Sequence, residues 1–300
     1  MFELKVFNQK INLNLVPKPR SYQNLMRSAK KQTAKIILKY KMKTTALITG
    51  ASNGIGLELA KIHARKGGDL VLVARNKSKL DEIKTELEKQ FNVSVYVIVK
   101  DLSEYNSAQE IYEETKKQNI IIDYLINNAG FGDFGMFAET AWNKEYNMIN
   151  LNIITLTLFT KLYLQDMVKR GSGKIMNVAS IASFQPGPTM AVYCASKAYV
   201  LSFTEAISNE TRNTGVSITA LCPGATETGF QAAGAMDESK LFKGKKLPSA
   251  QEVAEYGYSS MIKGKTVAIH GIINYIMSNS IRLIPRALAL KVTRKILEKA

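Results

Sequence analysis

The sequence holds 300 residues, of which 46% are hydrophobic and 22% charged, a balance typical of a soluble globular protein with one sizeable core. Its two cysteines, Cys194 and Cys222, belong to no Cys/His cluster. This argues against a disulfide framework and a metal site, and it indicates a reducing compartment. No apolar run approaches the roughly 18 residues that a spanning helix needs, so we expect no transmembrane anchor.

The net charge of +16 raises the question of a nucleic-acid-binding protein, but the basic residues are concentrated in two terminal segments. Residues 1–43 hold eleven Lys and Arg against one Glu, a net +10, and residues 263–300 hold eight against one, a net +7. The stretch between them therefore sums to −1. Aromatic residues do not alternate with the lysines in a base-stacking pattern, and we expect no nucleic-acid partner.

This distribution divides the chain into a folded domain over 44–262 and two basic extensions. For residues 1–43 three interpretations stay open: a transit-like presequence, a disordered arm, or a segment upstream of a fold that effectively begins at Met42. The segment lacks the compact apolar core and cleavage site of a secretory signal. Residues 263–300 are predicted to form a basic helical C-terminal tail.

From Thr45 onward, short apolar runs alternate with helix-length segments. Strands are predicted at 46–49, 70–74, 95–99, 121–127, 174–179 and 216–221, with helices at 55–66 and 78–90 between the first three. Strands that are apolar along their whole length are buried on both faces, as in a parallel sheet covered by helices. We therefore predict an α/β fold: a single Rossmann-like, doubly wound parallel sheet with helices on both faces.

A glycine-rich turn directly follows the first predicted strand, with the sequence Thr49-Gly50-Ala51-Ser52-Asn53-Gly54-Ile55-Gly56. Glycines here let the chain turn tightly and bring backbone N–H groups and a helix N-terminus against a pyrophosphate. With Thr49 in front, the spacing Gly-x-x-x-Gly-x-Gly resembles the short-chain dehydrogenase/reductase family, and the resemblance extends over roughly residues 44–230. It implies that 44–262 is a dinucleotide-binding catalytic domain, with cofactor contacts from Gly50, Ser52, Asn53, Gly54, Ile55 and Gly56.

The end of the second strand, where that family binds the adenosine ribose, reads Val73-Ala74-Arg75. A neutral residue followed by Arg75 favours NADP(H) over NAD(H), since a guanidinium pairs bidentately with a phosphate. The resemblance further implies that Asp101 meets the adenine amino group. Asn128, in the turn Asn127-Asn128-Ala129-Gly130, is expected to tie strands together as much as to contact cofactor.

The segment Tyr193-Cys194-Ala195-Ser196-Lys197 places a phenol and an ammonium on one helix face, at positions i and i+4. The lysine charge and the positive ring of an oxidised nicotinamide are expected to lower the tyrosine pKa from its usual value near 10. In the family these residues act with a serine and an asparagine, which implies the catalytic set Asn152, Ser180, Tyr193 and Lys197. Asn150 competes with Asn152, which fits the following helix register better.

After the strand at 216–221 comes Pro223-Gly224-Ala225-Thr226-Glu227-Thr228, where the family has a turn near the nicotinamide carboxamide. Thr226 and Thr228 compete for that contact, and Thr228 has the family spacing. The implied cofactor residues of this part are Tyr193, Lys197, Pro223, Gly224, Thr226 and Thr228.

The resemblance implies an NAD(P)H-dependent oxidoreductase that interconverts a carbonyl and an alcohol by hydride transfer. We expect an NADPH-dependent reductase of a hydrophobic ketone or aldehyde; the alternative is a non-catalytic nucleotide-binding scaffold or sensor. A small-molecule substrate pocket is predicted near 131–138, 182–192 and the loop 229–250, with apolar lining from Phe131, Phe134, Met136, Phe137 and Phe184.

The remaining features are predicted to serve packing or surface roles. His63 and His270 are isolated, and Cys194 lacks a histidine that would activate it. The stretch 281–300 mixes basic residues with Leu288, Val292 and Ile296 at helical spacing. It favours either packing or peripheral contact with a membrane surface. We expect a cytoplasmic protein. The sequence leaves the oligomeric state open, and the family resemblance is consistent with a homodimer or homotetramer.

Overall fold

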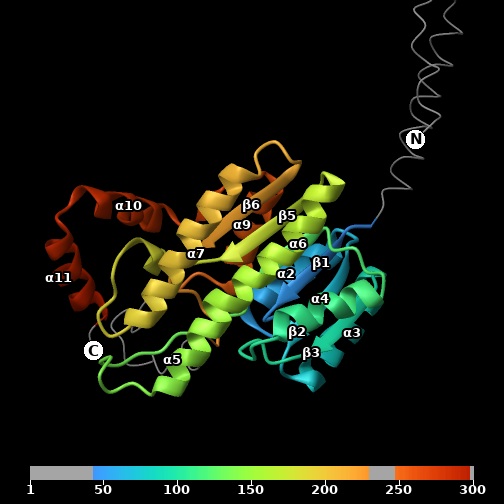
Figure 1. Ribbon diagram of the computed structural model, residues 1–300, viewed down its shortest axis with the longest axis horizontal. Helices are drawn as coiled ribbons and strands as arrows, with labels where there is room; N and C mark the ends of the chain where they lie inside the picture. The colour runs from blue at the N-terminus through green and yellow to red at the C-terminus, as the bar shows by residue number, and fades with distance from the viewer. Residues whose placement is uncertain (1–42, 230–246, 298–300) are drawn as a thin grey trace, which may run out of the picture. The chain divides into compact units, whose positions relative to one another are not determined.

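The computed structural model describes residues 43–229 and 247–297, and within them seven parallel strands form one sheet (Figure 1). The strand order is β3-β2-β1-β4-β5-β6-β7. The strands are β1 (Thr45–Thr49), β2 (Asp69–Ala74), β3 (Val95–Val99), β4 (Tyr124–Asn127), β5 (Gly173–Val178), β6 (Val216–Cys222) and β7 (Val267–Ile269).

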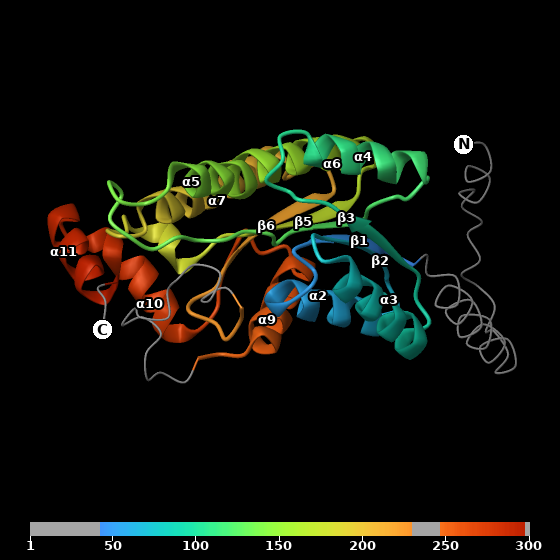
Figure 2. The same ribbon diagram turned by 90° about the horizontal axis from the view of Figure 1, so that it is seen from below.

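Helices cover both faces of this sheet, which confirms the predicted fold class. Figure 2 shows α2, α3 and α9 on one face and α4, α5, α6 and α7 on the other. The α-helices are α2 (Gly54–Arg65), α3 (Lys77–Phe91), α4 (Ser107–Lys117), α5 (Trp142–Ile149), α6 (Leu156–Arg170), α7 (Ala191–Glu210), α9 (Ala250–Ile262), α10 (Ile272–Ser280) and α11 (Arg286–Leu297). Three shorter elements are the π-helix η1 (Asn150–Thr155) and the 3-10 helices η2 (Ile181–Phe184) and η3 (Ile281–Leu283).

The fully apolar strands supply two cores, one on each face of the sheet. In β1, Ala46 and Ile48 belong to the cluster under α2, α3 and α9, whereas Leu47 belongs to the cluster under α4 and α6. All three side chains have no exposed surface. This alternation explains why positions 46–48 are all apolar, since each of these side chains is buried against a helix layer and stabilises the fold by about 1–3 kcal/mol.

The strand order reverses at β1, which pairs with β2 on one side and with β4 on the other. Crossovers leave β1 and β4 in opposite directions, so their carboxyl ends border a crevice, the usual ligand position in a doubly wound sheet. The glycine turn after β1 and the turn 128–130 after β4 both lie there.

The predicted C-terminal tail, residues 263–300, differs from the structure at its start. β7 lies within 263–300, so the first residues of the segment predicted as a tail belong to the sheet, where Ala268 pairs with Leu221 of β6. The predictions for residues 1–42 and for most of the loop 229–250 fall outside the described residues. Within the described ranges, no helix combines the length and apolarity required to cross a bilayer.

Candidate active site

The glycine turn after β1 is closely packed against the turn after β4. Gly50 has φ +65°, and a Cβ there would lie 2.9 Å from Asn128 Nδ2 and 3.0 Å from Ala129 Cα. A Cβ on Gly56 would lie 2.3 Å from the carbonyl oxygen of Gly50. Only glycine fits these two positions, because a side chain would collide with backbone atoms.

Asn128 holds the two turns together. Its Nδ2 donates to the carbonyl oxygen of Thr49 at 2.9 Å, and its backbone N–H donates to Thr49 Oγ1 at 3.0 Å. Thr49 Oγ1 also accepts from the backbone N–H of Ala129 at 2.9 Å. The strand-tying function expected of Asn128 is therefore visible in its contacts, and its amide nitrogen is engaged by the turn itself.

The helix α2 begins directly in this turn, with Asn53 as its N-cap residue. The Asn53 side chain makes no capping hydrogen bond, and the first turn of α2 carries no acidic residue. Ser52 and Asn53 thus lie at a helix N-terminus whose free N–H groups and dipole suit an anion such as a pyrophosphate. The residues present at this turn fit a dinucleotide.

Arg75 and Asp101 come together at the neighbouring strand ends. Arg75 follows β2 and Asp101 comes shortly after β3, and Arg75 Nη1 lies 3.7 Å from Asp101 Oδ2. Burial disfavours the charged form of Asp101, but hydrogen bonds from the backbone N–H and hydroxyl of Ser103, together with Arg75, outweigh it and lower its pKa. The exposed guanidinium leaves room for a phosphate beside the end of β2.

Tyr193 and Lys197 lie one turn apart on α7, and both are buried. The Tyr193 side chain is hydrogen-bonded to Ser180, which follows β5. Lys197 Nζ donates to the carbonyl oxygen of Val178 at 2.8 Å and lies 5.9 Å from the centroid of the Tyr193 ring. The structure thus brings together the three residues that the sequence placed on two separate elements.

Burial sets the ionisation of this group. It raises the pKa of Tyr193, and the hydrogen bond with Ser180 opposes that rise only in part. It also lowers the pKa of Lys197 to about 8. The pKa of Tyr193 therefore moves in the direction opposite to the one expected from the lysine charge and an oxidised nicotinamide, because desolvation of the phenolate dominates in the protein by itself. The phenol is therefore protonated at neutral pH and available as a proton donor.

Asn152 reaches the same site from the π-helix η1. Its Nδ2 donates to the carbonyl oxygen of Phe131 at 3.0 Å and to Ser196 Oγ at 3.1 Å, while its Oδ1 accepts from the backbone N–H of Phe131. A Cβ on Gly130 would lie 2.9 Å from Asn152 Oδ1 and 3.4 Å from Lys197 Nζ, so both side chains border Gly130. Asn150 is also buried. Among the described residues, the Asn150 side chain forms no hydrogen bond with Phe131 or Ser196.

The turn after β6 completes the carboxyl edge of the sheet. The carbonyl oxygen of Pro223 accepts from the backbone N–H of Ile181, which joins this turn to the segment after Ser180. Thr226 Oγ1 donates to the carbonyl oxygen of Gly224 at 2.9 Å. A Cβ on Gly54 would lie 3.2 Å from the Thr228 side chain, so Thr228 is the threonine that adjoins the glycine turn.

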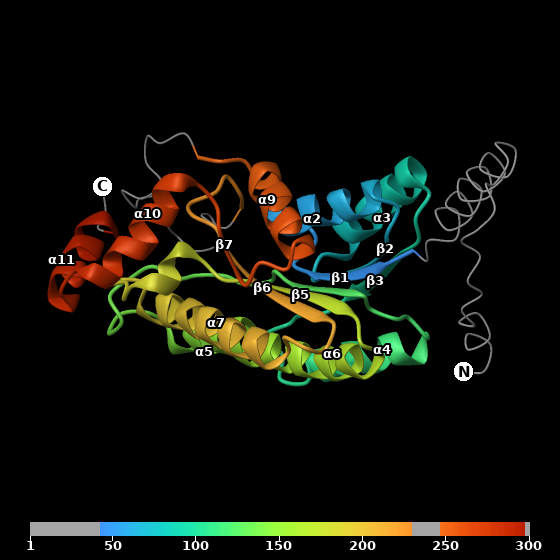
Figure 3. The ribbon, with the colours of Figure 1, turned by 90° about the horizontal axis from the view of Figure 1, so that it is seen from above.

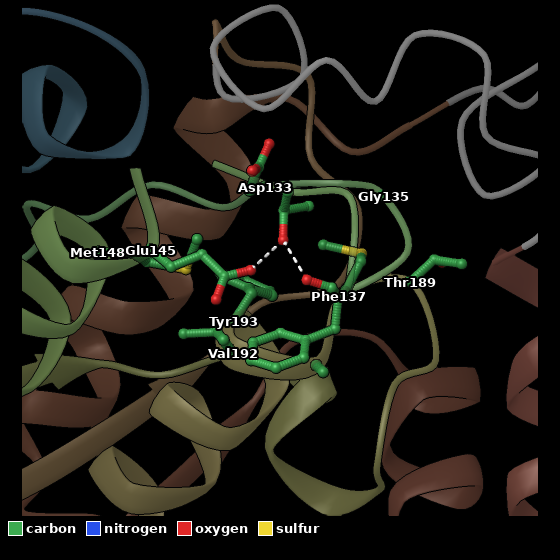
Figure 4. Close-up of a pocket in the computed structure, with 11 residues that line it drawn as sticks. Asp133, Gly135, Phe137, Glu145, Met148, Thr189, Val192 and Tyr193 are labelled. Atoms are coloured by element: carbon green, nitrogen blue, oxygen red, sulfur yellow. Dashed lines mark hydrogen bonds between the residues drawn. The ribbon is translucent and has the colours of Figure 1, made fainter. Parts of the chain in front are cut away.

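A narrow pocket opens beside Tyr193, with space for little more than a water molecule (Figure 4). Phe137 and Met148 form part of its apolar wall, and Thr140 donates a hydrogen bond to the Glu145 carboxylate at 2.5 Å. The lining consists of Asp133, Gly135, Phe137, Thr140, Glu145, Met148 and residues 189–193.

The aromatic residues predicted for the substrate pocket divide between this region and the core. Phe131 and Phe134 pack against a cluster that contains Tyr193, Met148, Met190, Cys194 and Leu297, whereas Phe184 packs in the core beside α7. Met136 is exposed. Leu297, at the end of α11, is the member of this cluster that the sequence did not predict, since no local pattern relates α11 to the segment of Tyr193.

The histidines are placed away from this chemistry. His63 is buried, with Nδ1 at 2.9 Å from the Tyr258 hydroxyl and Nε2 at 3.0 Å from the carbonyl oxygen of Thr44. His270 lies against the ring of Tyr256 at a centroid distance of 5.4 Å. Cys194 and Cys222 are buried free thiols.

Comparison with known proteins points to one family. Residues 44–239 match the family model of the short chain dehydrogenases. The very-long-chain 3-oxoacyl-CoA reductase of Anas platyrhynchos is 32% identical over 59% of this chain, and the match spans 58% of that protein. The NADP-dependent 3-hydroxy acid dehydrogenase of Schizosaccharomyces pombe is 31% identical over 75% of this chain and 89% of its own length.

Among solved structures, a short-chain dehydrogenase of Sphingobium yanoikuyae in complex with NADPH superimposes with a TM-score of 0.72. It is 29% identical, and the alignment covers 80% of this chain and 93% of that one. The sheet order, the match over 44–239 and these relatives agree, and the chain belongs to the short chain dehydrogenase family.

Proposed function

We propose that the protein is an NADPH-dependent reductase of a hydrophobic ketone or aldehyde. The observation that carries this proposal is the buried group of Tyr193, Ser180 and Lys197 at the carboxyl edge of the sheet, beside a turn that suits a dinucleotide. A protonated phenol hydrogen-bonded to a serine, in an apolar setting, has the chemistry needed to protonate an oxygen.

The choice of NADPH rests on the end of β2. Arg75 follows the last residue of the strand and its side chain is exposed, and its Nη1 lies 3.7 Å from Asp101 Oδ2. A ribose 2′-phosphate there would gain a charge-assisted pairing with the guanidinium, whereas a 2′-hydroxyl would gain little. The NADPH complex of the Sphingobium yanoikuyae relative and the NADP dependence of the Schizosaccharomyces pombe relative support the same choice.

The reduction divides between cofactor and protein as follows. The glycine turn and Arg75 would hold NADPH, which would supply the hydride that the carbonyl carbon accepts. Ser180 orients the carbonyl oxygen and donates a hydrogen bond to it as negative charge develops. Tyr193 transfers its phenolic proton to that oxygen, so that the carbonyl becomes an alcohol. Lys197, whose Nζ donates to the Val178 carbonyl, stabilises the phenolate that remains on Tyr193. Asn152 positions the backbone of Phe131 by a hydrogen bond to its carbonyl oxygen.

The apolar character of the substrate rests on the cluster around Tyr193. Met148 and Leu297 belong to the apolar cluster that contains the tyrosine, Phe131 and Phe134 pack against that cluster, and Phe137 adds an exposed ring at the pocket. Such a surface favours an aliphatic or aromatic ketone over a sugar, because a polar substrate would lose its hydrogen bonds to water there.

The test is oxidation of NADPH, followed by absorbance, in the presence of a panel of apolar ketones and aldehydes. The intact protein should turn over at least one of them, and Tyr193→Phe should lower the rate at least about 100-fold while leaving NADPH binding unchanged. Full activity of Tyr193→Phe would contradict the assignment. NADPH binding without turnover of any carbonyl would favour the non-catalytic scaffold instead.

A further inference from the structure

The helix α10 turns its apolar residues outward and its small polar residues inward. Ile273 and Ile276 are 70% and 58% exposed, whereas Ser278 is 3% exposed. Ile272 and Met277 lie on the same face as the two isoleucines, since positions i, i+1, i+4 and i+5 share one side of a helix. A surface helix of a globular protein normally shows the reverse pattern.

The inward face of α10 is polar because it rests on the catalytic edge. Asn274 Nδ2 donates to the carbonyl oxygen of His270 at 2.8 Å, and a Cβ on Gly224 would lie 2.5 Å from that nitrogen. The helix is therefore seated on the turn after β6, the turn that adjoins the cofactor position. This seating fixes the outward direction of the isoleucines.

The apolar surface continues through η3 into α11. Leu283 is 86% exposed, and Leu288, Leu290 and Val292 are also exposed. The inward face of α11 is formed by Ala289, Thr293 and Leu297, the last of which packs in the cluster around Tyr193. Figure 3 shows both helices beyond the carboxyl ends of the strands, far from α3. We call this surface, formed by the exposed residues of 272–292, the α10–α11 surface.

The charged side chains of the segment that forms this surface have one sign. Residues 271–297 carry five basic side chains and no Asp or Glu. The basic residues are Arg282, Arg286, Lys291, Arg294 and Lys295, all exposed. A two-fold contact between copies of the chain would bring this positive set against itself, which is repulsive. An anionic lipid surface offers both an apolar layer for the isoleucines and negative headgroups for the arginines and lysines.

We propose that the α10–α11 surface docks the protein on an anionic lipid bilayer, with Ile273, Ile276 and Leu283 in the acyl boundary. The docked edge is the one that carries Tyr193 and the cofactor turn, so an apolar carbonyl dissolved in the bilayer lies next to the site. The docking itself does not depend on the reductase activity proposed above, because binding requires neither NADPH nor a substrate.

The experiment measures sedimentation of the full chain with vesicles of phosphatidylcholine alone or mixed with phosphatidylglycerol. The wild-type protein should bind the mixed vesicles, less so as salt rises, and Ile273→Ser with Ile276→Ser should weaken binding at least about tenfold. The matched control is Ile121→Ser with Val168→Ser. Ile121 is 65% exposed, and both residues lie outside α10 and α11, so this variant should bind like the wild type.

A second measurement locates the contact. Because Cys194 and Cys222 are buried, Leu283→Cys offers the one accessible thiol of the chain for an environment-sensitive fluorophore, whose emission should shift to the blue on mixed vesicles. Wild-type protein that fails to bind, or a double serine variant that binds equally well, would overturn the proposal. A dimer that the same variant dissociates without lipid would overturn it in favour of a second copy.

Discussion

Lys197 donates a 2.8 Å hydrogen bond from Nζ to the carbonyl oxygen of Val178, and the two residues thereby join the catalytic helix α7 to the last residue of β5. The bond holds a buried ammonium whose pKa falls to about 8 through desolvation. Its charge is therefore present at neutral pH and is lost within the range in which enzymes are assayed.

The first prediction concerns the pH dependence of catalysis. In the wild-type protein kcat/KM for carbonyl reduction should fall as pH rises through about 8, because Lys197 loses the charge that stabilises the Tyr193 phenolate. Lys197→Met should lower the rate at neutral pH at least about 100-fold and abolish this limb of the profile. An alkaline limb that persists unchanged in Lys197→Met would assign the titration to another group.

The second prediction concerns cofactor choice. Arg75→Ala should reduce the preference for NADPH over NADH about 10- to 100-fold, which corresponds to one charge-assisted pairing with a phosphate. Fluorescence titration with each nucleotide measures both affinities. Lys84→Ala is the control, since Lys84 is a basic residue of α3 that pairs with Glu88 and lies outside the cofactor turn. If both variants keep the preference, the phosphate is bound elsewhere.

The third prediction separates the two neighbouring asparagines. Asn152→Ala removes three hydrogen bonds that link η1 to Phe131 and Ser196, so kcat should fall and the pH profile of kcat/KM should shift. Asn150→Ala is a matched control, because Asn150 is equally buried on the same short element. Melting temperatures of both variants separate loss of stability from loss of activity. A larger kinetic defect in Asn150→Ala would reverse the assignment.

Much of the sheet could be predicted because most of its strands contain a short run of apolar residues that is buried on both faces. β1, β2 and β3 agree with the predicted ranges to within a residue. β7 was not recognised, since Val267–Ile269 is only three residues long and follows a basic, glycine-containing stretch. Pairing with β6 creates this strand, and such tertiary pairing leaves little trace in a local pattern.

The sequence predicts those parts of the site that depend on residue spacing within one element. It does not predict the parts that depend on contacts between segments far apart in the chain. Tyr193 and Lys197 are four residues apart, so a helix places them on one face. The π-helix at Asn150–Thr155 could not be predicted, because its residues would also fit an α-helix. Likewise, the spacing of Ile273 and Ile276 indicates one apolar face of a helix, but it does not show that this face of α10 is the exposed one. That outcome depends on the contact between Asn274 and Gly224, which joins segments far apart in the chain.

The last prediction concerns stability and His63, which links α2 to α9 through Tyr258 and to Thr44 before β1. Burial lowers the pKa of His63 from its usual value of 6.5, and this exceeds the opposing effect of the Thr44 carbonyl and of Asp123. The unfolded chain therefore binds a proton more readily than the folded one. The stabilising contribution is present above about pH 6.5 and is lost as pH falls through the folded-state pKa.

Chemical denaturation between pH 8 and pH 5 measures this loss, at about 1.4 kcal/mol for each unit by which the two pKa values differ. His63→Gln keeps a donor for the Thr44 carbonyl but cannot titrate, so the loss of unfolding free energy below about pH 6.5 should shrink in this variant. His270→Gln removes the only other histidine and should leave the wild-type dependence intact. If His270→Gln flattens the curve and His63→Gln does not, the buried imidazole is not the group that limits stability in acid.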